Sequence, residues 1–332
     1  MTPVYSLVVP IYNEEAVLPL LLRRLDALLD ALDGPAEAIF VDDGSRDTGP
    51  IVLEAKARSD NRYRFIKLSR NFGHQIAITT GMDYALGEAV IVMDGDLQDP
   101  PEVVLEMIAK WREGYQVVYA QRMSRDGESA FKRVTAGLFY RLLDQLSDVP
   151  IPRDVGDFRL VDRRALDSFL AMPEQDRFVR GMFAWVGFRQ TVVRFRRPGR
   201  AAGETKYSLT KMVRLAANGV VSFSDAPLRL ALWAGLAVST LAILYGLWVI
   251  GLWAVNANLT RGWSSLMVVV TFLGGANMLM TGIMGAYVGR IYAEVKRRPL
   301  YVVDRTVGFA TSTAPVRERL ESSPPRTRGL GR

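Results

Sequence analysis

Two aspartates and a glutamine at alternate positions follow an apolar run in the first third of the chain. Residues 90–93 are apolar, and Asp94, Asp96 and Gln98 come directly after them. Because alternate residues of a strand face the same side, these three side chains are expected to present their oxygens together. Oxygen is the ligand atom that Mg²⁺ and Mn²⁺ prefer in proteins. The pattern therefore predicts a divalent cation site of the kind that a departing diphosphate requires.

A solvated acidic turn before a helix is the alternative explanation for this cluster. Asp-x-Asp is a common pattern, and Pro100 and Pro101 suit the first turn of a helix. The position of the cluster favours chemistry, since open α/β sheets bind ligands at the carboxyl ends of their strands.

The composition excludes several kinds of site. The 332 residues include no cysteine and one histidine, which excludes disulfides and thiol nucleophiles and argues against Cys- or His-rich zinc sites. Any metal must therefore be bound through oxygen. The formal net charge of +7 suits a nucleotide diphosphate, a lipid phosphate or an anionic membrane surface. Nucleic acid is not expected as a partner, because the sequence contains no motif for binding it.

Strand-like and helix-like segments alternate from residue 5 to about residue 119. This alternation predicts an α/β domain with a mostly parallel sheet and right-handed crossovers. The expected strands are 7–10, 38–41, 64–68 and 89–93, and the expected helices are 15–32, 48–59 and 75–86. The amino terminus lacks the charged and apolar regions of a signal peptide, so this domain is expected to remain in the cytoplasm.

Residues that could form a binding site also lie at or just after the ends of the other three expected strands. They are Pro10, Tyr12, Asn13 and Glu14 after the first, Asp42, Asp43 and Ser45 after the second, and Lys67 and Arg70 at the end of the third. Each set alone is ordinary turn chemistry. Together, on one edge of a parallel sheet, they predict a nucleotide site. The aromatic ring would stack on a base, the carboxylates would accept hydrogen bonds from the nucleoside, and the cations would lie near the phosphates.

Two long apolar runs lie in the carboxyl-terminal third. Residues 228–255 and 266–288 each exceed the roughly 20 residues needed to cross a bilayer, which predicts two transmembrane helices within residues 227–291. A pair of buried core helices is the alternative. Basic residues flank both runs, so the positive-inside rule predicts that both termini and the catalytic domain are cytoplasmic. The expected location is the cell membrane.

Further segments predict how the chain contacts the membrane and how it assembles. Residues 208–226 are expected to form a basic amphipathic helix at the membrane surface, and residues 131–146 either a second such helix or a cover for the core. Residues 292–332 form a cytoplasmic tail, with disorder expected after about residue 312. Small residues such as Gly275 and Gly282 suit close helix packing, either within the chain or between subunits.

With these motifs in view, the chain resembles family 2 glycosyltransferases of the GT-A (Rossmann-like) fold, within a domain covering residues 1–207. More narrowly it resembles the polyprenyl-phosphate glycosyltransferases, which include dolichol-phosphate mannose synthases and bactoprenol glucosyltransferases. The similarity covers about residues 4 to 305. The motifs that carry it are Pro10-Ile-Tyr-Asn-Glu14, Val41-Asp-Asp-Gly-Ser45, Asp94-Gly-Asp-Leu-Gln-Asp-Pro-Pro101, Gly156-Asp157-Phe158-Arg159 and Arg200-x-x-Gly203-x-Thr205-Lys206-Tyr207.

The resemblance implies roles by position. Nucleoside binding falls to Tyr12, Glu14, Asp42 and Asp43, and binding of the metal and the donor diphosphate to Asp94, Asp96 and Gln98. The basic residues matched to phosphate groups are Arg200 and Lys206 at the membrane face and Arg122 and Arg133 near the lipid phosphate. Asp157 matches the catalytic aspartate of the family, and a capping or ion-paired aspartate is its alternative.

The activity implied is inverting transfer of one sugar from a nucleotide-diphosphate sugar to undecaprenyl or another polyprenyl phosphate, with Mg²⁺ or Mn²⁺ as cofactor. UDP-glucose is the favoured donor, and GDP-mannose, UDP-N-acetylglucosamine and UDP-aminoarabinose remain open. A lipid monophosphate has a second pKa near about 6, so it is already a nucleophile at neutral pH. Asp157 would then orient the acceptor or stabilise positive charge on the sugar rather than act as an obligatory base.

Two other functions remain open, a processive polysaccharide synthase and a non-catalytic nucleotide-sugar-binding scaffold. The Gln-x-x-Arg-Trp motif of processive relatives is absent where Arg177 and Arg180 occur. These arginines are expected on the phosphate or acceptor side, with a surface ion pair as the alternative. His74 is expected to be a hydrogen-bonding loop residue. Relatives with two spans suggest a homo-oligomer, and specifically a tetramer.

Overall fold

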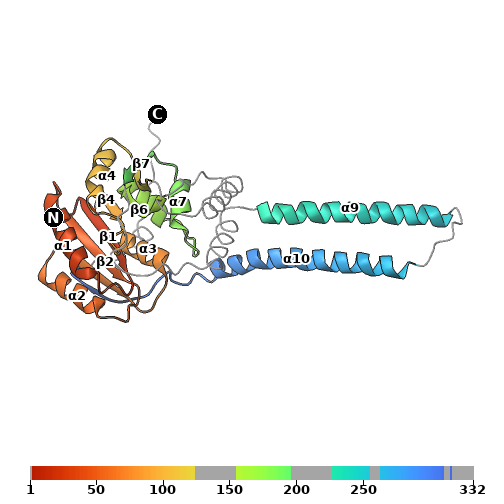
Figure 1. Ribbon diagram of the computed structural model, residues 1–332, viewed down its shortest axis with the longest axis horizontal. Coiled ribbons are helices and arrows are strands. Elements are labelled where there is room, and N and C mark those ends of the chain that lie inside the picture. The colour runs from red at the N-terminus through yellow and green to blue at the C-terminus, as the bar shows by residue number, and fades with distance from the viewer. Residues whose placement is uncertain (1, 124–154, 196–225, 255–261, 310–314, 316–332) are drawn as a thin grey trace, which may run out of the picture. The chain divides into compact units, whose positions relative to one another are not determined.

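The computed structural model describes residues 2–123, 155–195, 226–254, 262–309 and 315 (Figure 1). The described chain divides into two compact units. The first contains a sheet with its covering helices, and the second contains two long helices.

Eight strands form one sheet among the described residues of the first unit, in the order β7-β5-β6-β4-β1-β2-β3-β8. The strands are β1 (Tyr5–Ile11), β2 (Ala36–Asp42), β3 (Tyr63–Leu68), β4 (Ala89–Val92), β5 (Val117–Arg122), β6 (Val155–Asp162), β7 (Gln190–Phe195) and β8 (Val303–Val307). β4, β1, β2 and β3 are parallel neighbours, whereas β6 runs antiparallel between β4 and β5. The predicted α/β domain with a mostly parallel sheet is therefore confirmed.

Helices connect the strands on both faces of this sheet. They are α1 (Leu18–Ala31), α2 (Gly49–Ser59), α3 (His74–Tyr84), α4 (Val103–Arg112), α6 (Arg163–Leu170) and α7 (Val179–Trp185). The three helices predicted from periodicity all form, although α1 begins three residues later than expected. The helix expected from the proline pair is α4, and it begins at Val103.

The core lies between the sheet and its two helical layers. Buried leucines of α1, such as Leu21 and Leu25, and buried residues of α4 belong to the same cluster as Leu7 and Val9 of β1. The alternate residue Val8 faces the opposite layer, where Gly81 of α3 approaches it so closely that a Cβ would collide with its Cγ1 atom. This alternation explains why β1 is apolar throughout, since a central parallel strand is buried on both faces.

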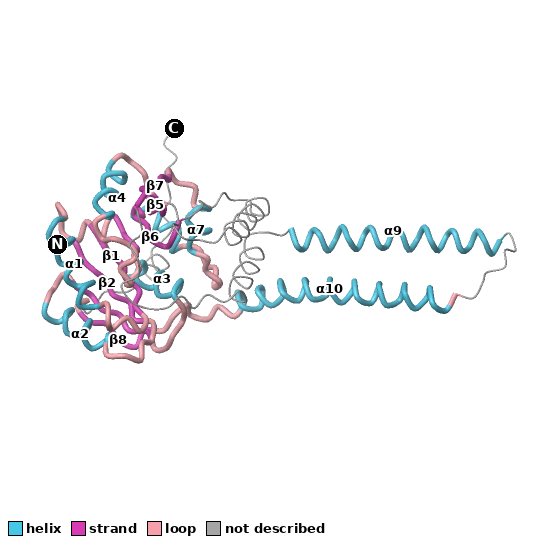
Figure 2. The backbone as a smooth tube through the Cα atoms, viewed as in Figure 1, coloured by secondary structure: helices cyan, strands magenta, loops and turns pink. Residues whose placement is uncertain are grey.

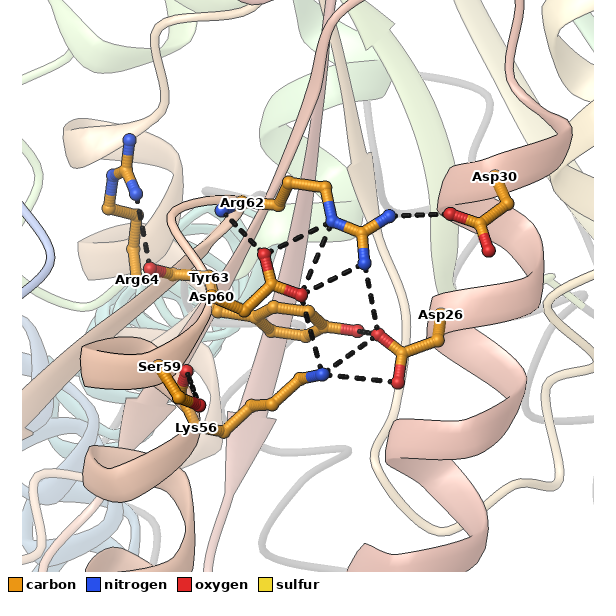
Figure 3. Close-up of polar contacts among 8 residues, drawn as sticks. All are labelled: Asp26, Asp30, Lys56, Ser59, Asp60, Arg62, Tyr63 and Arg64. Carbon is orange, nitrogen blue, oxygen red and sulfur yellow. Dashed lines mark hydrogen bonds and ion pairs between the residues drawn. The ribbon is translucent and has the colours of Figure 1, made fainter.

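A network of charges joins the carboxyl-terminal halves of α1 and α2 to the start of β3, away from the polar strand endings (Figure 3). Lys56 and Arg62 both contact Asp26 of α1, and Arg62 also contacts Asp60 at the end of α2. The Tyr63 hydroxyl donates to Asp26 at 2.8 Å. The network thereby fastens α1 and α2 to the start of β3.

Strand β8 was not predicted from the sequence, which gave a tail in this region. It pairs antiparallel with β3, and the Ser69 amide extends the pairing by donating to Val302 O at 2.9 Å. The Tyr301 hydroxyl donates to Asp83 at the end of α3 at 2.7 Å. A segment that follows the second long helix is thus part of the sheet unit.

The second unit contains α9 (Ala226–Ala254) and α10 (Trp263–Val295), two long helices that contact each other (Figure 2). Within the described part of the chain, no helix combines the length and the apolar character that a bilayer crossing requires. The two predicted transmembrane helices are therefore not confirmed. The segments predicted as amphipathic, 131–146 and nearly all of 208–226, lie outside the described residues, as does nearly all of the tail after residue 312.

Candidate active site

The acidic residues after β4 lie in a turn and not on a strand, which corrects the basis of the prediction. β4 ends at Val92, and Leu97 has a left-handed φ of 58°. The Gln98 amide donates to Asp96 Oδ1 at 3.0 Å, which closes the turn. Alternate spacing therefore does not put the three side chains on one strand face, because the left-handed residue reverses the chain between the second and the third.

The same turn contains a third carboxylate, the buried Asp99, to which the sequence analysis assigned no role. Its side chain accepts a 3.4 Å hydrogen bond from the Asp94 amide through Oδ2, and its Oδ1 is buried with no hydrogen-bond partner among the described residues. Burial, together with the charge of Asp94, raises the pKa of Asp99 to about 7. A buried carboxylate oxygen without a hydrogen bond calls for an explanation, and a ligand bound at this turn would provide one.

The arrangement suits a metal that arrives with its substrate. Asp94 Oδ1 is also buried without a hydrogen bond, and burial raises the pKa of Asp94. No group of three or more His, Asp or Glu side chains in the described ranges is arranged to hold a metal ion by itself. Mg²⁺ commonly takes only one or two carboxylates and completes its shell with water and substrate phosphates. The carboxylate oxygens of Asp94 and Asp96 fit that kind of site, which suits hard cations such as Mg²⁺ and Mn²⁺.

His74 connects this turn to Asp157, which lies on β6. Its Nε2 atom is 3.3 Å from Asp94 Oδ1 and 3.3 Å from Asp157 Oδ2. The contact with Asp94 has the distance of an ion pair but not the geometry of a hydrogen bond. Asp94 Oδ1 therefore accepts no hydrogen bond among the described residues. Burial lowers the pKa of His74, but the hydrogen bond to Asp157 and the charge of Asp94 outweigh it, so the pKa is raised. The only histidine of the chain therefore has a larger structural role than the sequence indicated.

Asp157 is surrounded by hydrogen-bond donors. Gln75 Nε2 donates to its Oδ2 at 3.0 Å, and Arg180 Nε donates to its Oδ1 at 3.0 Å. Arg159 Nη2 reaches Oδ1 at 3.3 Å. Burial alone would raise the pKa of Asp157, but the hydrogen bond from His74 and the charges of the two arginines hold it well below its usual range. Asp157 is therefore a permanent carboxylate in this setting and a weak base.

The two arginines differ in exposure. Arg159 is fully buried, stacks over the rings of Tyr119 and Phe183, and donates to the backbone carbonyls of Gly156 and Asp157. Arg180 lies in the first turn of α7, and one third of its side chain is exposed. Arg159 thus neutralises Asp157 from within the core, while Arg180 adds a second positive charge that solutes can reach.

Asp42, at the end of β2, has a buried carboxylate oxygen that is available to a ligand. Its Oδ1 accepts from the Ser45 amide at 3.1 Å, and its Oδ2 is fully buried with no hydrogen-bond partner in the described chain. Burial raises the pKa of Asp42, an effect opposed by the Ser45 hydrogen bond and the charge of Lys67. Such an oxygen is suited to accept a hydrogen bond from a buried N–H group of a ligand.

Other residues predicted to bind the nucleoside also join the loops to one another. The Asn13 amide donates to Ser45 Oγ at 2.9 Å, and Asn13 Oδ1 accepts from the Arg46 amide at 2.9 Å. Both oxygens of Asp43 accept from the amides of Phe72 and Gly73, at 2.7 and 2.9 Å. These contacts tie together the loops that follow β1, β2 and β3.

Gly44 makes this loop contact sterically feasible. It has a φ of 75°, and a Cβ atom there would lie 2.7 Å from the Asn71 amide nitrogen. Tyr12 is 45% exposed beside these loops, as a base-stacking ring would be. Glu14 accepts from the Val17 amide through its carbonyl at 3.0 Å, at the start of α1.

Comparison with known proteins places the chain in a family. Its residues 6–170 match the family described as Glycosyl transferase family 2. YkcC, an uncharacterized glycosyltransferase of Bacillus subtilis, is 49% identical over 305 residues, which cover 92% of this chain and 94% of the relative. The chain belongs to glycosyl transferase family 2.

Two further proteins are similar to the chain. The SfII prophage-derived bactoprenol glucosyl transferase of Shigella flexneri is 40% identical over 301 residues, covering 91% of this chain and 97% of the relative. Among solved structures, glucosyl-3-phosphoglycerate synthase from Mycobacterium tuberculosis is 21% identical with a TM-score of 0.47, covering 66% of this chain and 79% of that chain.

In this family 2 glycosyltransferase, one residue matched to lipid phosphate lies within the described chain. Arg122 ends β5, and a Cβ on Gly156 would lie 3.0 Å from its Nη2 atom, so the glycine leaves room for the guanidinium. Its charge opposes the rise that burial causes in the pKa values of Asp94 and Asp99, which places it near the acidic turn. The other matched residues, Arg133, Arg200 and Lys206, lie outside the described residues.

The remaining predicted residues have more ordinary surroundings. Pro10 belongs to the buried strand β1, and the guanidinium of Arg70 lies 4.0 Å from the centre of the Phe72 ring. Arg177 is buried, stacks on Phe169 and donates to the Glu174 carbonyl. Arg177 therefore shapes the loop before α7 and is not the surface ion pair considered from the sequence.

Sequence reasoning missed Gln75 altogether. Its partners Asp157 and Val179 lie 82 and 104 positions away in the chain. The only available signal was its place at the start of the helix expected over residues 75–86, after the third strand, and that signal does not distinguish it from its neighbours.

Proposed function

We propose that this protein transfers one glucosyl residue from UDP-glucose to a polyprenyl phosphate, such as undecaprenyl phosphate. The observation that carries the proposal is the pairing of the acidic turn after β4 with Asp157 through His74, at 3.3 Å on each side. The turn supplies oxygen donors for a cation and a diphosphate, and Asp157 and Arg180 supply the opposite wall. The similarity to the bactoprenol glucosyl transferase of Shigella flexneri supports glucose as the sugar and bactoprenol as the acceptor.

The nucleoside would bind over the loops after β1 and β2. Asp42 Oδ2 supports this placement, since a uracil ring offers an imide N–H to such an oxygen. Tyr12 would cover one face of the base, and the cation Lys67 near Asp42 would lie on the phosphate side.

The transfer reaction does not require a general base. An oxygen of the acceptor phosphate attacks the anomeric carbon, the bond to the donor's diphosphate oxygen breaks, and the nucleoside diphosphate leaves with the bonding electrons. Because the acceptor is already anionic near neutral pH, no proton has to be removed from it. The low pKa of Asp157 agrees with a role in orienting the acceptor or stabilising positive charge on the sugar. A single displacement inverts the anomeric centre.

A divalent cation would be held by Asp94 and Asp96, with Gln98 closing the turn. When bound it would stabilise the negative charge of the leaving diphosphate. Mg²⁺ and Mn²⁺ are the ions that this oxygen set favours.

The first experiment is transfer of radiolabelled sugar into butanol-extractable undecaprenyl phosphate, with UDP-glucose, GDP-mannose, UDP-N-acetylglucosamine and UDP-aminoarabinose as separate donors. We expect labelled lipid from UDP-glucose, and its loss with EDTA and in Asp96→Asn. Glu106→Gln, an exposed substitution on α4, is the matched control and should retain activity. A labelled lipid from another donor would replace the sugar assignment. Donor binding without transfer by any donor would favour the scaffold, and a polymer would favour the processive synthase.

We further propose that α9 and α10 attach the enzyme to the cell membrane, with the catalytic unit in the cytoplasm. Large apolar side chains support this proposal, because Leu232, Trp233 and Leu241 of α9 are each about two-thirds exposed. Side chains of this kind are costly to leave in water as a continuous surface. Carbonate extraction of membranes tests it, since release of the protein into the soluble fraction would contradict membrane insertion.

The helix pair also supports the predicted homo-oligomer. A Cβ on Gly235 of α9 would lie 3.4 Å from Met280 of α10, so that glycine faces the partner helix. A Cβ at Gly275, Gly282 or Gly289 would meet no described atom within 4 Å. The glycines of α10 thus leave room for another subunit. Native mass spectrometry of the detergent-solubilised protein, with a tetramer expected, is the test.

A further inference from the structure

The side-chain amide of Gln75 joins two parts of the active site that are distant in sequence. Its Nε2 donates to Asp157 Oδ2 at 3.0 Å, and its Oε1 accepts from the Val179 amide at 3.2 Å. A carboxylate can only accept and a backbone amide can only donate, so a single orientation of the Gln75 amide satisfies both partners. A flipped amide would lose both hydrogen bonds.

The two partners are connected to each other through Arg180. Val179 is the first residue of α7 and directly precedes Arg180, whose Nε and Nη2 atoms lie 3.0 and 3.3 Å from the two oxygens of Asp157. Gln75 therefore contacts both the carboxylate and the first residue of the helix that carries Arg180. The buried Arg159 holds Asp157 from behind but makes no such link to the first turn of α7 beyond a long 3.5 Å contact with the Val179 carbonyl.

We propose that Gln75 is a positioning residue of the transfer reaction, which keeps Asp157 and Arg180 together as one unit on the acceptor side of the site. The inference rests on the proposed function and adds to it a residue that touches neither the donor nor the metal. Misplacement of reacting groups by about 1 Å can cost about a hundredfold in rate, so loss of this link should lower kcat more than it alters donor binding.

Two substitutions separate the halves of the link. Gln75→Met keeps the length of the side chain and removes both hydrogen bonds. Gln75→Glu keeps an acceptor for the Val179 amide and replaces the donor to Asp157 with a second carboxylate. If the contact with Asp157 carries the effect, the glutamate variant should be at least as impaired as the methionine variant.

Gln116 offers a matched control. Its side chain also spans two backbone groups, because Nε2 donates to Gly114 O at 2.9 Å and Oε1 accepts from the Arg189 amide at 3.2 Å. It lies next to Asp162, at the opposite end of β6 from Asp157. Gln116→Met therefore removes a comparable pair of hydrogen bonds outside the site.

The experiment measures kcat and KM for transfer from UDP-glucose to undecaprenyl phosphate by the full-length protein in detergent, with Tm for each variant. We expect a fall in kcat of about 10- to 100-fold for Gln75→Met, a change in donor KM below about 3-fold, and kcat within about 2-fold of wild type for Gln116→Met. An unchanged kcat in either Gln75 variant would overturn the inference. An equal fall in Gln116→Met would also overturn it, because the effect would then be general loss of stability. Wild-type protein that transfers no sugar would refute the proposed function itself, which is a separate outcome.

Discussion

Asp157 and Arg180 form a two-point ion pair, with Nε 3.0 Å from Oδ1 and Nη2 3.3 Å from Oδ2. The pair joins β6 to α7, and Asp157 is almost completely buried within it. An arginine fork matches the geometry of a carboxylate, and it matches a phosphate equally well. Arg180 could therefore bind an acceptor phosphate in place of, or together with, the carboxylate of Asp157.

We expect Asp157→Asn to abolish most transfer and to destabilise the fold. The substitution leaves the buried guanidinium of Arg159 without its carboxylate, and breaking a buried ion pair in this way costs about 3 kcal/mol or more. Transfer should fall by about a hundredfold or more, while metal-dependent binding of UDP should persist in the folded fraction.

Asp162→Asn is the control for that variant. Asp162 is the last residue of the same strand and accepts from the Arg164 amide at 3.0 Å as the cap of α6. Asp162 Oδ2 also accepts from Trp111 Nε1 at 2.8 Å, and asparagine keeps only one acceptor oxygen. Asparagine caps helices nearly as well, so we expect a loss of stability of about 1 kcal/mol from the contact with Trp111 and little change in transfer. Activity of Asp157→Asn close to that of the control would show that the carboxylate is not needed.

Asp42→Asn should weaken donor binding without destabilising the protein. The substitution replaces one carboxylate oxygen with an N–H donor, which either faces the ligand N–H or displaces the Ser45 hydrogen bond. It also removes a buried charge, whose pKa is raised by burial, so Tm should stay constant or rise. Titration calorimetry with UDP and Mn²⁺ should show a Kd increased about 10-fold or more.

Glu113→Gln, an exposed change at the end of α4, supplies the comparison for Asp42→Asn. Unchanged affinity for UDP in Asp42→Asn would exclude this oxygen from the nucleoside site. Equal affinity losses in both variants would point to an effect of net charge.

Tyr301→Phe should lower the stability of the sheet unit. The Tyr301 hydroxyl donates to the buried Asp83 at 2.7 Å, and a hydrogen bond to a charged group contributes about 1.5–3 kcal/mol. We expect a lower denaturant midpoint by circular dichroism. Arg305→Gln, on the adjacent strand β8, breaks only an exposed pair with Glu54 and should cost below about 1 kcal/mol. The reverse order of the two effects would show that the Tyr301 contact is dispensable.

Acid should lower the free energy of unfolding, in part because Asp60 becomes protonated and loses its ion pair with Arg62. The hydrogen bond from Arg62 is the main cause that lowers the pKa of Asp60 from 3.8 to about 2 in the folded protein (Figure 3). Because the folded pKa is the lower one, the stabilisation is present above about pH 4 and disappears as the pH falls toward 2. Asp60→Asn should therefore cost about 1–2 kcal/mol near pH 7, after allowance for partial exposure, and little at pH 2.

Denaturant melts of wild type and Asp60→Asn at several pH values between 2 and 7 measure this difference. Asp30→Asn removes a more exposed partner of the same Arg62, with 69% of the Asp30 side chain exposed, and should change stability much less. A difference between wild type and Asp60→Asn that does not vary with pH would contradict the assignment.

The order of elements and the edge that carries the polar residues were predictable from sequence. Residues 38–41 and 89–93 are apolar runs of strand length, and residues 15–32 repeat leucines at helical spacing. Local patterns of this kind report burial, and burial on both faces is what a central parallel strand requires. The placement of Asp42 and Asp94 at the same edge of the sheet, on either side of β1, follows from that topology.

The turn at Leu97 and the strand β8 could not be predicted in the same way. A left-handed leucine has no local signature, because its conformation depends on the contacts that Asp96 and Asp99 make around it. The middle residues of β8 are polar and exposed, so the segment shows no strand-like alternation, and its pairing partner β3 lies far away in the chain.

Amino-acid types and short-range spacing were therefore enough to establish the family, the sheet and the chemistry of oxygen ligands. The contacts of Asp157 with His74, Gln75 and Arg180 depend instead on the packing of α3 and α7 against β6, which brings together residues separated by 23 to 83 positions. Hydrogen bonds and ion pairs act over about 3 Å, and only the folded chain sets distances on that scale between residues so far apart in sequence.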